Sequence, residues 1–243
     1  MTRIEHDHRH PPRHPPHPYG LHISDLWLTR GAILAVVALQ VMFVNDVTVV
    51  PRWVMPTLEI LLLVPLSAVT VWTVDRATRA STDEHRLGVA HWRQLIRRAL
   101  LVLTGIVTLA NLLALYGLVR AMLGGHAGSG QTLLIDAVNI WITNVIAFAL
   151  WYWNLDGGGP AFRTHIAGPA DFLFTQQTIP HASHEFSAGF IDYLFLAFTN
   201  ATAFSPADTF PLTARAKLLM MTESLSSLVT IAVVASRAVG ILS

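Results

Sequence analysis

The side chains with the most chemical potential are polar residues inside stretches that are otherwise apolar. The densest group lies between residues 186 and 204, where Asp192, Thr199, Asn200 and Thr202 interrupt a run of aromatic and aliphatic residues. At helical spacing, Asp192, Thr199 and Thr202 fall near one face, with Asn200 beside it. A polar stripe on an apolar helix faces protein or water instead of lipid. The stripe therefore predicts either the lining of a pathway or hydrogen-bonded contacts between helices.

Two further acids follow this group. Asp208 lies in a connection between two prolines, and Glu223 lies about one and a half helical turns after Lys217. An ionisable group at membrane depth costs about 2.5–3.5 kcal/mol on insertion scales and is a functional candidate by default. Asp192 or Glu223 is therefore a hypothetical proton or cation site. The alternative is a buried acid that pairs with Lys217 or Arg237. The pathway-lining candidates are Asp192, Thr199, Asn200, Thr202, Asp208 and Glu223.

Histidines supply a second kind of chemistry. The first 22 residues interleave histidine with proline, which excludes a helix and is typical of a solvated, extended tail. Histidine-rich tracts also bind metal ions weakly, so a metal-binding tail is the alternative. Its candidate ligands are His6, His8, His10, His14 and His17. A separate pair, His181 and His184, is followed by Glu185 and has metal-compatible spacing. No other acidic residue is fixed near this pair.

Enzyme motifs are absent from the sequence. It contains no Gly-x-Ser-x-Gly, no His-Glu-x-x-His and no P-loop, and the glycines at 157–159 follow a membrane helix instead of a strand. The chain also lacks cysteine, which excludes disulfides, zinc–thiolate sites, iron–sulfur clusters and thiol catalysis. We therefore predict neither an enzyme activity nor a cofactor.

Composition predicts the elements that position these side chains. Of 243 residues, 53% are hydrophobic and only 13% are charged, whereas a soluble domain carries about 25% charged residues. The net charge of +1 argues against a nucleic-acid partner. The predicted class is an all-α, polytopic integral membrane protein whose first partner is the lipid bilayer.

About 20 apolar helical residues cross a bilayer core, and six segments meet or approach this length. They lie near residues 25–45, 57–74, 96–122, 132–153, 186–204 and 212–241. Residues 23–243 are therefore expected to form one transmembrane domain behind the tail of residues 1–22. The fifth segment is short and polar, so it either crosses the membrane or re-enters and returns.

Basic residues predict the orientation, because positive loops stay in the cytoplasm. Six arginines lie between Asp75 and Arg98, so this loop and the N-terminal tail two spans earlier are expected on the cytoplasmic side. If the fifth segment crosses, Arg215 and Lys217 lie outside; if it re-enters, they lie inside. The charge rule does not separate these versions. A full crossing keeps a small preference because it places both termini inside.

Local signals refine three positions. Thr213 is expected to cap the last helix, and Asp208 to hydrogen-bond the backbone of its own turn. Trp151-Tyr152-Trp153 is typical of an interfacial aromatic belt. The fourth segment also carries its own polar stripe, made of Asp136, Asn139, Thr143 and Asn144.

The second half of the chain resembles a known family. Trp151-Tyr152-Trp153 with Asp156-Gly-Gly-Gly, then Asp171-Phe-Leu-Phe-Thr-Gln-Gln, is similar to a family of bacterial polytopic membrane proteins known only as a domain of unknown function. The block from Asp192 to Thr209, and Pro211-Leu-Thr with Ala216-Lys-Leu-Leu-Met, fit the same pattern. The resemblance covers about residues 150–243 and implies a bacterial inner-membrane location. It brings no substrate, cofactor or active-site residue.

The same block distantly resembles a potassium-channel pore module, with a pore helix, a filter, a proline turn and an inner helix. These would correspond to residues 192–198, 199–208, 211 and 218–239. The filter motif Thr-Val-Gly-Tyr-Gly is absent and residues 199–208 contain no glycine, whereas carbonyl-lined filters need residues that tolerate unusual backbone angles. This departure argues against potassium selectivity and leaves a less selective path open.

Two functions are consistent with these patterns. The leading expectation is a six-helix inner-membrane protein in which the fourth to sixth segments surround a pathway for a small ion or solute. The alternative is a non-transporting membrane scaffold or accessory subunit, in which the polar stripe holds helices together. A homo-oligomer is compatible with either. Metal handling by the histidine-rich tail is a third hypothesis.

Overall fold

The computed structural model describes residues 84–124, 130–159, 170–179, 186–203, 205 and 208–242, and scattered positions between residues 27 and 61. Those scattered positions are helical and fall within the first two predicted segments. The rest of these two segments, the tail with its five histidines, and the pair at 181 and 184 lie outside the described residues.

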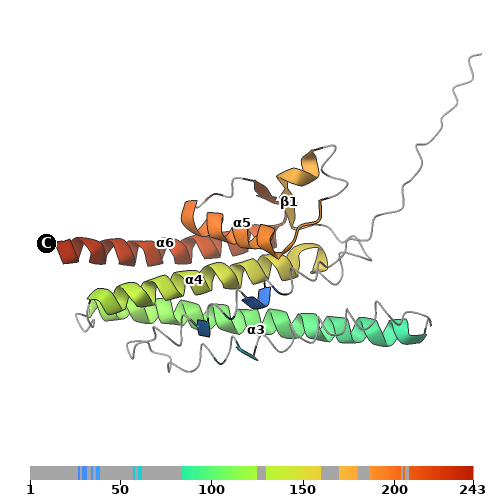
Figure 1. Cartoon of the computed structure of the whole chain (residues 1–243), viewed down its shortest axis with the longest axis horizontal. Helices are drawn as coiled ribbons and strands as arrows, with labels where there is room; N and C mark the ends of the chain where they lie inside the picture. The colour runs from blue at the N-terminus through green and yellow to red at the C-terminus, as the bar shows by residue number, and fades with distance from the viewer. Residues whose placement is uncertain are drawn as a thin grey trace, which may run out of the picture.

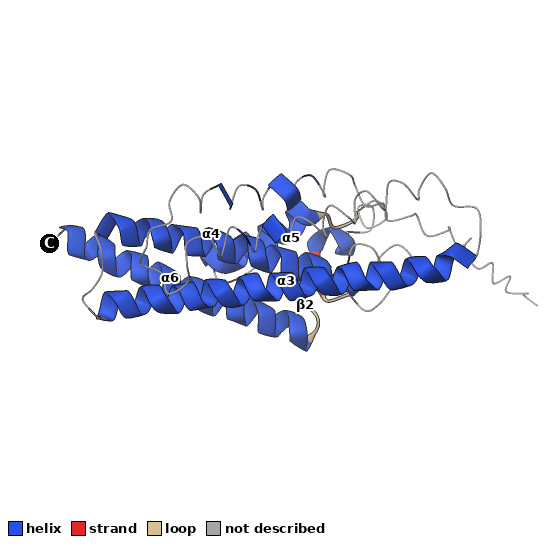
Figure 2. Ribbon diagram, turned by 90° about the horizontal axis from the view of Figure 1, so that it is seen from below, coloured by secondary structure: helices blue, strands red, loops and turns tan. Residues whose placement is uncertain are grey.

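Four α-helices make up most of the described chain: α3 (Glu84–Leu123), α4 (Gly130–Leu155), α5 (Phe190–Ala203) and α6 (Ala214–Leu242). The α4 helix contacts the other three. Figures 1 and 2 show α3, α4 and α6 lying side by side along the long axis, with the short α5 against one side. The small elements are two 3₁₀ turns, Asp156–Gly158 and Thr175–Thr178, and strands β1 (Phe172–Phe174) and β2 (Thr209–Pro211).

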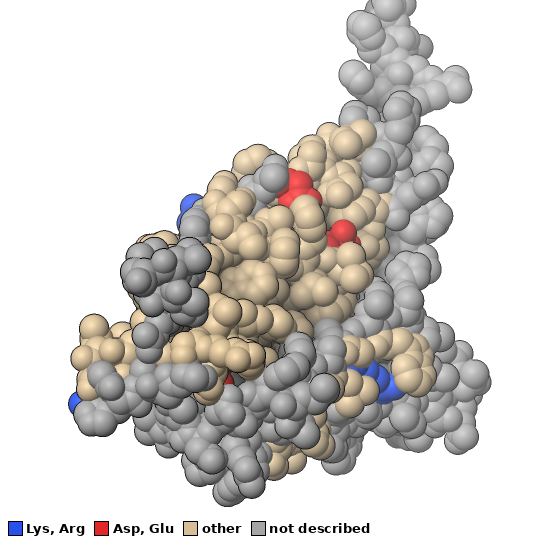
Figure 3. All heavy atoms as spheres, turned by 60° about the vertical axis from the view of Figure 1, so that its left-hand side comes forward, with Lys and Arg blue, Asp and Glu red and all other residues tan. Residues whose placement is uncertain are grey.

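Three of the helices are long and apolar enough to cross a membrane, over Arg97–Leu123, Gly130–Gly158 and Ala214–Ser236. They match the third, fourth and sixth predicted segments, so the helical membrane class is confirmed for this part of the chain. Their outward faces carry apolar side chains such as Leu109 and Leu225, which are exposed in the isolated chain. Figure 3 shows the same property, because charged atoms are few on the visible described surface. The total of six spans stays a prediction.

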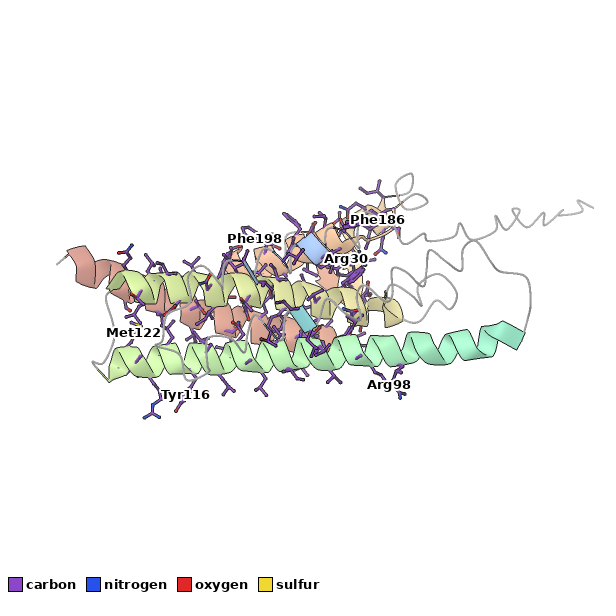
Figure 4. The ribbon with its side chains drawn as sticks, turned by 60° about the horizontal axis from the view of Figure 1, so that its bottom comes forward. Arg30, Arg98, Tyr116, Met122, Phe186 and Phe198 are labelled. Atoms are coloured by element: carbon purple, nitrogen blue, oxygen red, sulfur yellow. The ribbon has the colours of Figure 1, made fainter. Side chains whose placement is uncertain are left out.

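The prediction that residues 75–98 form a loop was wrong for its second half. The α3 helix begins at Glu84 instead of near residue 96, and its N-terminal part extends past the end of α4 (Figure 1). Hydropathy marks only the apolar part of a helix, whereas the backbone ladder continues through good polar helix formers such as Arg and Gln. On the outer side of α3, Arg98 and Tyr116 point away from the bundle (Figure 4).

The α5 helix enters the bundle but does not cross it. Its 14 residues extend about 21 Å at 1.5 Å per residue, less than the roughly 30 Å of a bilayer core. Its first residue lies at the end of α4, where the ring centroids of Phe190 and Trp153 are 5.7 Å apart. Further along, Phe198 packs edge-on against Trp141 in the middle of α4. Figure 4 shows Phe198 correspondingly further into the bundle than Phe186.

After α5 the chain returns to the end where it entered. Strand β2 pairs antiparallel with β1, with Leu173 opposite Phe210. Strand β1 is held at the C-terminal end of α4, because the Phe172 amide donates to Asp156. The preference for a full crossing by the fifth segment was therefore wrong. The geometry is that of the alternative, in which the segment dips in and returns.

The α6 helix starts at this same end and runs antiparallel to α4. The amide of Ala216 donates to Oγ1 of Thr213 at 3.3 Å, which confirms the predicted cap. Along α6, Glu223 contacts Tyr152 and Ser227 contacts Asn144, earlier on α4. Arg215 and Lys217 therefore lie at the end of the bundle where α4 finishes.

Three glycines end α4, and they confirm that this run is a turn. Gly157, Gly158 and Gly159 have φ values of 56°, 88° and 91°, which side chains with a Cβ rarely adopt. At Gly159 a Cβ would also lie 2.8 Å from the carbonyl oxygen of Asn154. Only glycine therefore fits this close approach.

Replacing Gly159 by alanine is expected to destabilise the protein by at least about 1–3 kcal/mol, because the strained backbone angle and the close contact add. Gly105→Ala is the matched control, since its Cβ would sit 3.5 Å from the Trp151 ring, an ordinary contact. Thermal unfolding of the purified protein in detergent measures both. Equal melting temperatures for the two variants would contradict the expectation.

Candidate functional site

A buried carboxyl lies where α4, α5 and α6 meet. Glu223 on α6 is 0% exposed. Its Oε2 atom accepts hydrogen bonds from the Tyr152 hydroxyl on α4, at 2.5 Å, and from Nδ2 of Asn200 on α5, at 2.6 Å. Among the described residues, no group donates a hydrogen bond to its Oε1 atom. We call Tyr152, Asn200 and Glu223 the Glu223 site.

The amide of Asn200 is fixed by two further contacts. Its Nδ2 atom also donates to the carbonyl oxygen of Met220, at 3.0 Å, and its Oδ1 atom accepts from the Ser224 hydroxyl, at 3.1 Å. Met220 and Ser224 flank Glu223 on α6. The side chain of Asn200 therefore contacts a full turn of that helix. The depth to which α5 enters the bundle thus determines whether the Glu223 site forms.

No described side chain pairs Glu223 with a positive charge. Among the described side chains, no positively charged group lies within ion-pair distance of its carboxyl, and Lys217 is exposed. The expectation of a pair with Lys217 was therefore wrong, and the side chain of Arg237 lies outside the described residues. The physical reason is helical phase: Lys217 faces outward, whereas Glu223 faces α4 and α5.

A second polar contact joins α4 and α6 deeper in the bundle. Asn144 donates to the Ser227 hydroxyl at 3.0 Å, and its Oδ1 atom accepts from the Ser226 hydroxyl at 3.1 Å. Asn111 on α3 donates to the carbonyl oxygen of Ile140 on α4 at 3.1 Å. These amides are buried and act as hydrogen-bonded contacts between helices.

The bundle end holds a second buried acid. Asp156, after α4, accepts two backbone N–H groups at Oδ1, from Asp171 at 2.7 Å and Phe172 at 3.2 Å. Its Oδ2 atom accepts the hydroxyl of Tyr193 on α5 at 2.5 Å. One carboxyl therefore ties α4, α5 and strand β1 together.

Asp171 ties the same strand to α6. Its carboxyl accepts from Nε and Nη2 of Arg215, at 2.6 and 2.5 Å, and from the Thr213 hydroxyl. Its carbonyl oxygen accepts the amide of Leu212 at 2.8 Å. Asp171 is 1% exposed, whereas the Arg215 side chain is 51% exposed. We call Asp156, Asp171, Tyr193, Thr213 and Arg215 the end cluster.

An aromatic ring lies between the two groups. The ring of Phe172 is 5.1 Å from that of Tyr152, in the Glu223 site, and 6.4 Å from that of Tyr193, in the end cluster. Both contacts are edge-on, and Phe172 is 1% exposed. The two buried acids are thus separated by a fully buried apolar side chain.

Of the six pathway candidates, the structure brings Asn200 and Glu223 together. Asp192 accepts the amide of Gly189 at 2.7 Å and caps the start of α5. The hydroxyls of Thr199 and Thr202 donate to carbonyl oxygens of their own helix. Asp208 lies beside β2, where its carboxyl accepts the neighbouring Thr209 hydroxyl instead of a turn amide.

Several residues of these groups carried no functional prediction. Tyr152 and Trp153 were expected at an interface but are 0% and 2% exposed, so the aromatic-belt interpretation was wrong for them. Asp156 and Asp171 stood out only as motif residues. The one signal that could have indicated Asp156 is an acid directly after an apolar helix and before three glycines.

The stretch compared with a channel filter also differs in structure. The α5 helix continues to Ala203, so residues 199–203, the first half of that stretch, are helical. Their carbonyl groups follow the helix axis instead of lining an extended filter.

Comparison of the chain with protein-family models, with curated proteins and with solved structures found no match. The resemblance to a bacterial membrane family therefore stays a prediction.

Proposed function

We propose that this chain is a bacterial inner-membrane protein in which Glu223 binds a proton or a small monovalent cation on a transport pathway between α4, α5 and α6. The observation that carries the proposal is the fully buried carboxyl of Glu223, which has two donors on one oxygen and, in the part of the chain that the structure describes, no partner on the other. The proposal includes membership of the membrane family that the sequence resembles.

Charge balance supports this role. An ionised carboxylate in a dry interior costs several kcal/mol unless a counter-charge is present, and the described side chains supply none near Glu223. A proton or a small cation at Oε1 removes this penalty. Tyr152 and Asn200 hold Oε2, which leaves Oε1 as the atom that binds and releases the ion.

The arginines between residues 75 and 98 favour a cytoplasmic position for the start of α3. Since α3 and α4 are antiparallel neighbours, the proposal assigns the end of α4, the end cluster and the entry of α5 to the cytoplasmic side. On this proposal the pathway opens toward the cytoplasm near α5, and a total of six spans surrounds it.

The test uses proteoliposomes and an apolar carbodiimide, dicyclohexylcarbodiimide, which adds a protonated carboxyl in an apolar site across its C=N bond. We expect covalent labelling of Glu223 by mass spectrometry and flux of H⁺, Na⁺ or K⁺, with both lost in Glu223→Gln. Asp192→Asn is the control and is expected to retain both. Absence of flux in the wild type, or unchanged flux in Glu223→Gln, would contradict the proposal.

A scaffold or accessory subunit is the second candidate, favoured by the closed hydrogen bonds of Asn144 with Ser226 and Ser227. Such contacts hold helices together without needing an ion. This function predicts no flux in the wild type, with lower folded yield or lost partner capture when the interhelical amides are removed. The flux measurement therefore separates the two candidates.

A further inference from the structure

The position of Phe172 on strand β1 depends on contacts made by the residue before it, Asp171. β1 and β2 have three residues each, and a two-stranded ribbon of this size is not stable alone. The ribbon is held at the bundle end by Asp171, directly before Phe172, through its contacts with Arg215, Thr213 and Asp156. The position of the Phe172 ring therefore depends on the carboxyl of Asp171 and on that of Asp156, which accepts the amides of Asp171 and Phe172.

The pair between Asp171 and Arg215 is also the part of this arrangement that reaches water. Arg215 is half exposed, whereas Asp171, Asp156 and Phe172 are buried. Breaking a pair with one buried partner is destabilising locally, because the buried carboxylate of Asp171 would keep only the weaker electrostatic interaction with Arg97. Loss of the guanidinium is therefore expected to loosen the ribbon at Asp171 before it affects the rest of the bundle.

We infer that the Phe172 ring is the barrier that closes the Glu223 site toward the bundle end, and that the Asp171–Arg215 pair is the latch that holds it shut. The ring contacts both Tyr152 and Tyr193, so its removal is expected to open space between the two tyrosine–carboxyl pairs. The role of the barrier, control of ion access, rests on the proposed function. The presence of the barrier is argued from the ring contacts and does not depend on that function.

The test exploits the absence of cysteine from the chain. Glu223→Cys introduces one thiol at the buried position, and a small charged methanethiosulfonate, added from the side of the end cluster, reports its access to water. In the Phe172→Ala background the labelling rate is expected to rise at least about tenfold, the factor that 1.4 kcal/mol of opening free energy supplies.

Phe174→Ala is the matched control. Phe174 is equally buried on the same strand, but its ring contacts Phe186 and Tyr193 instead of Tyr152. Its truncation removes a similar apolar side chain from the same strand but keeps the Phe172 ring and the Asp171–Arg215 pair in place. Equal labelling in the Phe172→Ala and Phe174→Ala backgrounds, or fast labelling of Glu223→Cys with no second substitution, would overturn the barrier.

Arg215→Gln tests the latch without touching the ring, and it also covers the case in which Phe172→Ala does not fold. We expect faster labelling at position 223 in this variant; an unchanged rate overturns the latch. A water-soluble carbodiimide, applied to native Glu223 in the same backgrounds, gives a second measurement if Glu223→Cys misfolds. Faster thiol labelling with no ion flux in the wild type would reject the proposed function and retain the barrier.

Discussion

Replacing Asp156 by alanine is expected to prevent recovery of folded protein. Its carboxyl accepts three buried donors, the amides of Asp171 and Phe172 and the hydroxyl of Tyr193. Each buried donor left without a partner costs about 1–3 kcal/mol. The sum, about 3–9 kcal/mol, is comparable to the whole stability of a typical domain, about 5–15 kcal/mol. Monodispersity on size exclusion and thermal unfolding in detergent measure the effect.

Two variants sharpen this result. Asp156→Asn keeps an oxygen for the two amides and turns an amide nitrogen toward the Tyr193 oxygen, so we expect a folded protein with a lower melting temperature. Asp208→Ala is the control on the same ribbon, because among the described residues its carboxyl binds the neighbouring Thr209 hydroxyl alone. Wild-type stability of Asp156→Ala, or a larger loss in Asp208→Ala, would show that Asp156 does not hold the bundle end.

Asn200→Ala is expected to destabilise the protein by about 2–4 kcal/mol, as is typical when a buried hydrogen-bond network is broken. The substitution removes the contacts to Glu223, Met220 and Ser224. Asp192→Asn is expected to cost less than about 1 kcal/mol, since asparagine also caps helix starts and keeps an acceptor for Gly189. Unfolding in mixed micelles of SDS and mild detergent gives both values.

This order differs from a ranking by charge alone, in which Asp192 stands above Asn200. A larger loss for Asp192→Asn than for Asn200→Ala would contradict the arrangement of the Glu223 site. Ion flux measured on the same preparations adds a second comparison. On the proposed function, Asn200→Ala lowers flux beyond the loss of folded protein, whereas on the scaffold alternative it lowers only the folded yield.

The three helices predicted correctly share one property: each contains a run of apolar residues long enough to indicate a membrane span. The start of α3 was missed because polar residues continue a helix without any hydropathy signal. The path of the fifth segment was ambiguous for a different reason: its length lies between that of a span and that of a buried helix. The pairing of Phe172 with Pro211 resolves it, and a contact between residues so far apart in sequence has no local signal.

The candidate site was predictable where burial makes a charge costly. Glu223 and Asn200 stand out for this reason, and the structure brings them together. Their partner Tyr152 does not, because an aromatic residue near a helix end is more typical of a membrane interface. Asp192 was predicted as a pathway residue because it is an acid in an apolar segment. An acid near the start of a helix accepts free backbone amides, so its presence there requires no pathway.

The length of α5 has a consequence for biogenesis. With 14 residues, this helix is too short to be retained in a bilayer as an independent span. The groups that hold Asn200 belong to Met220, Glu223 and Ser224, which the ribosome adds later. During synthesis α5 can therefore pack Phe190 and Phe198 against α4, which is already made. Asn200, in contrast, gains its hydrogen-bond partners only when α6 emerges, so α5 reaches its final position late.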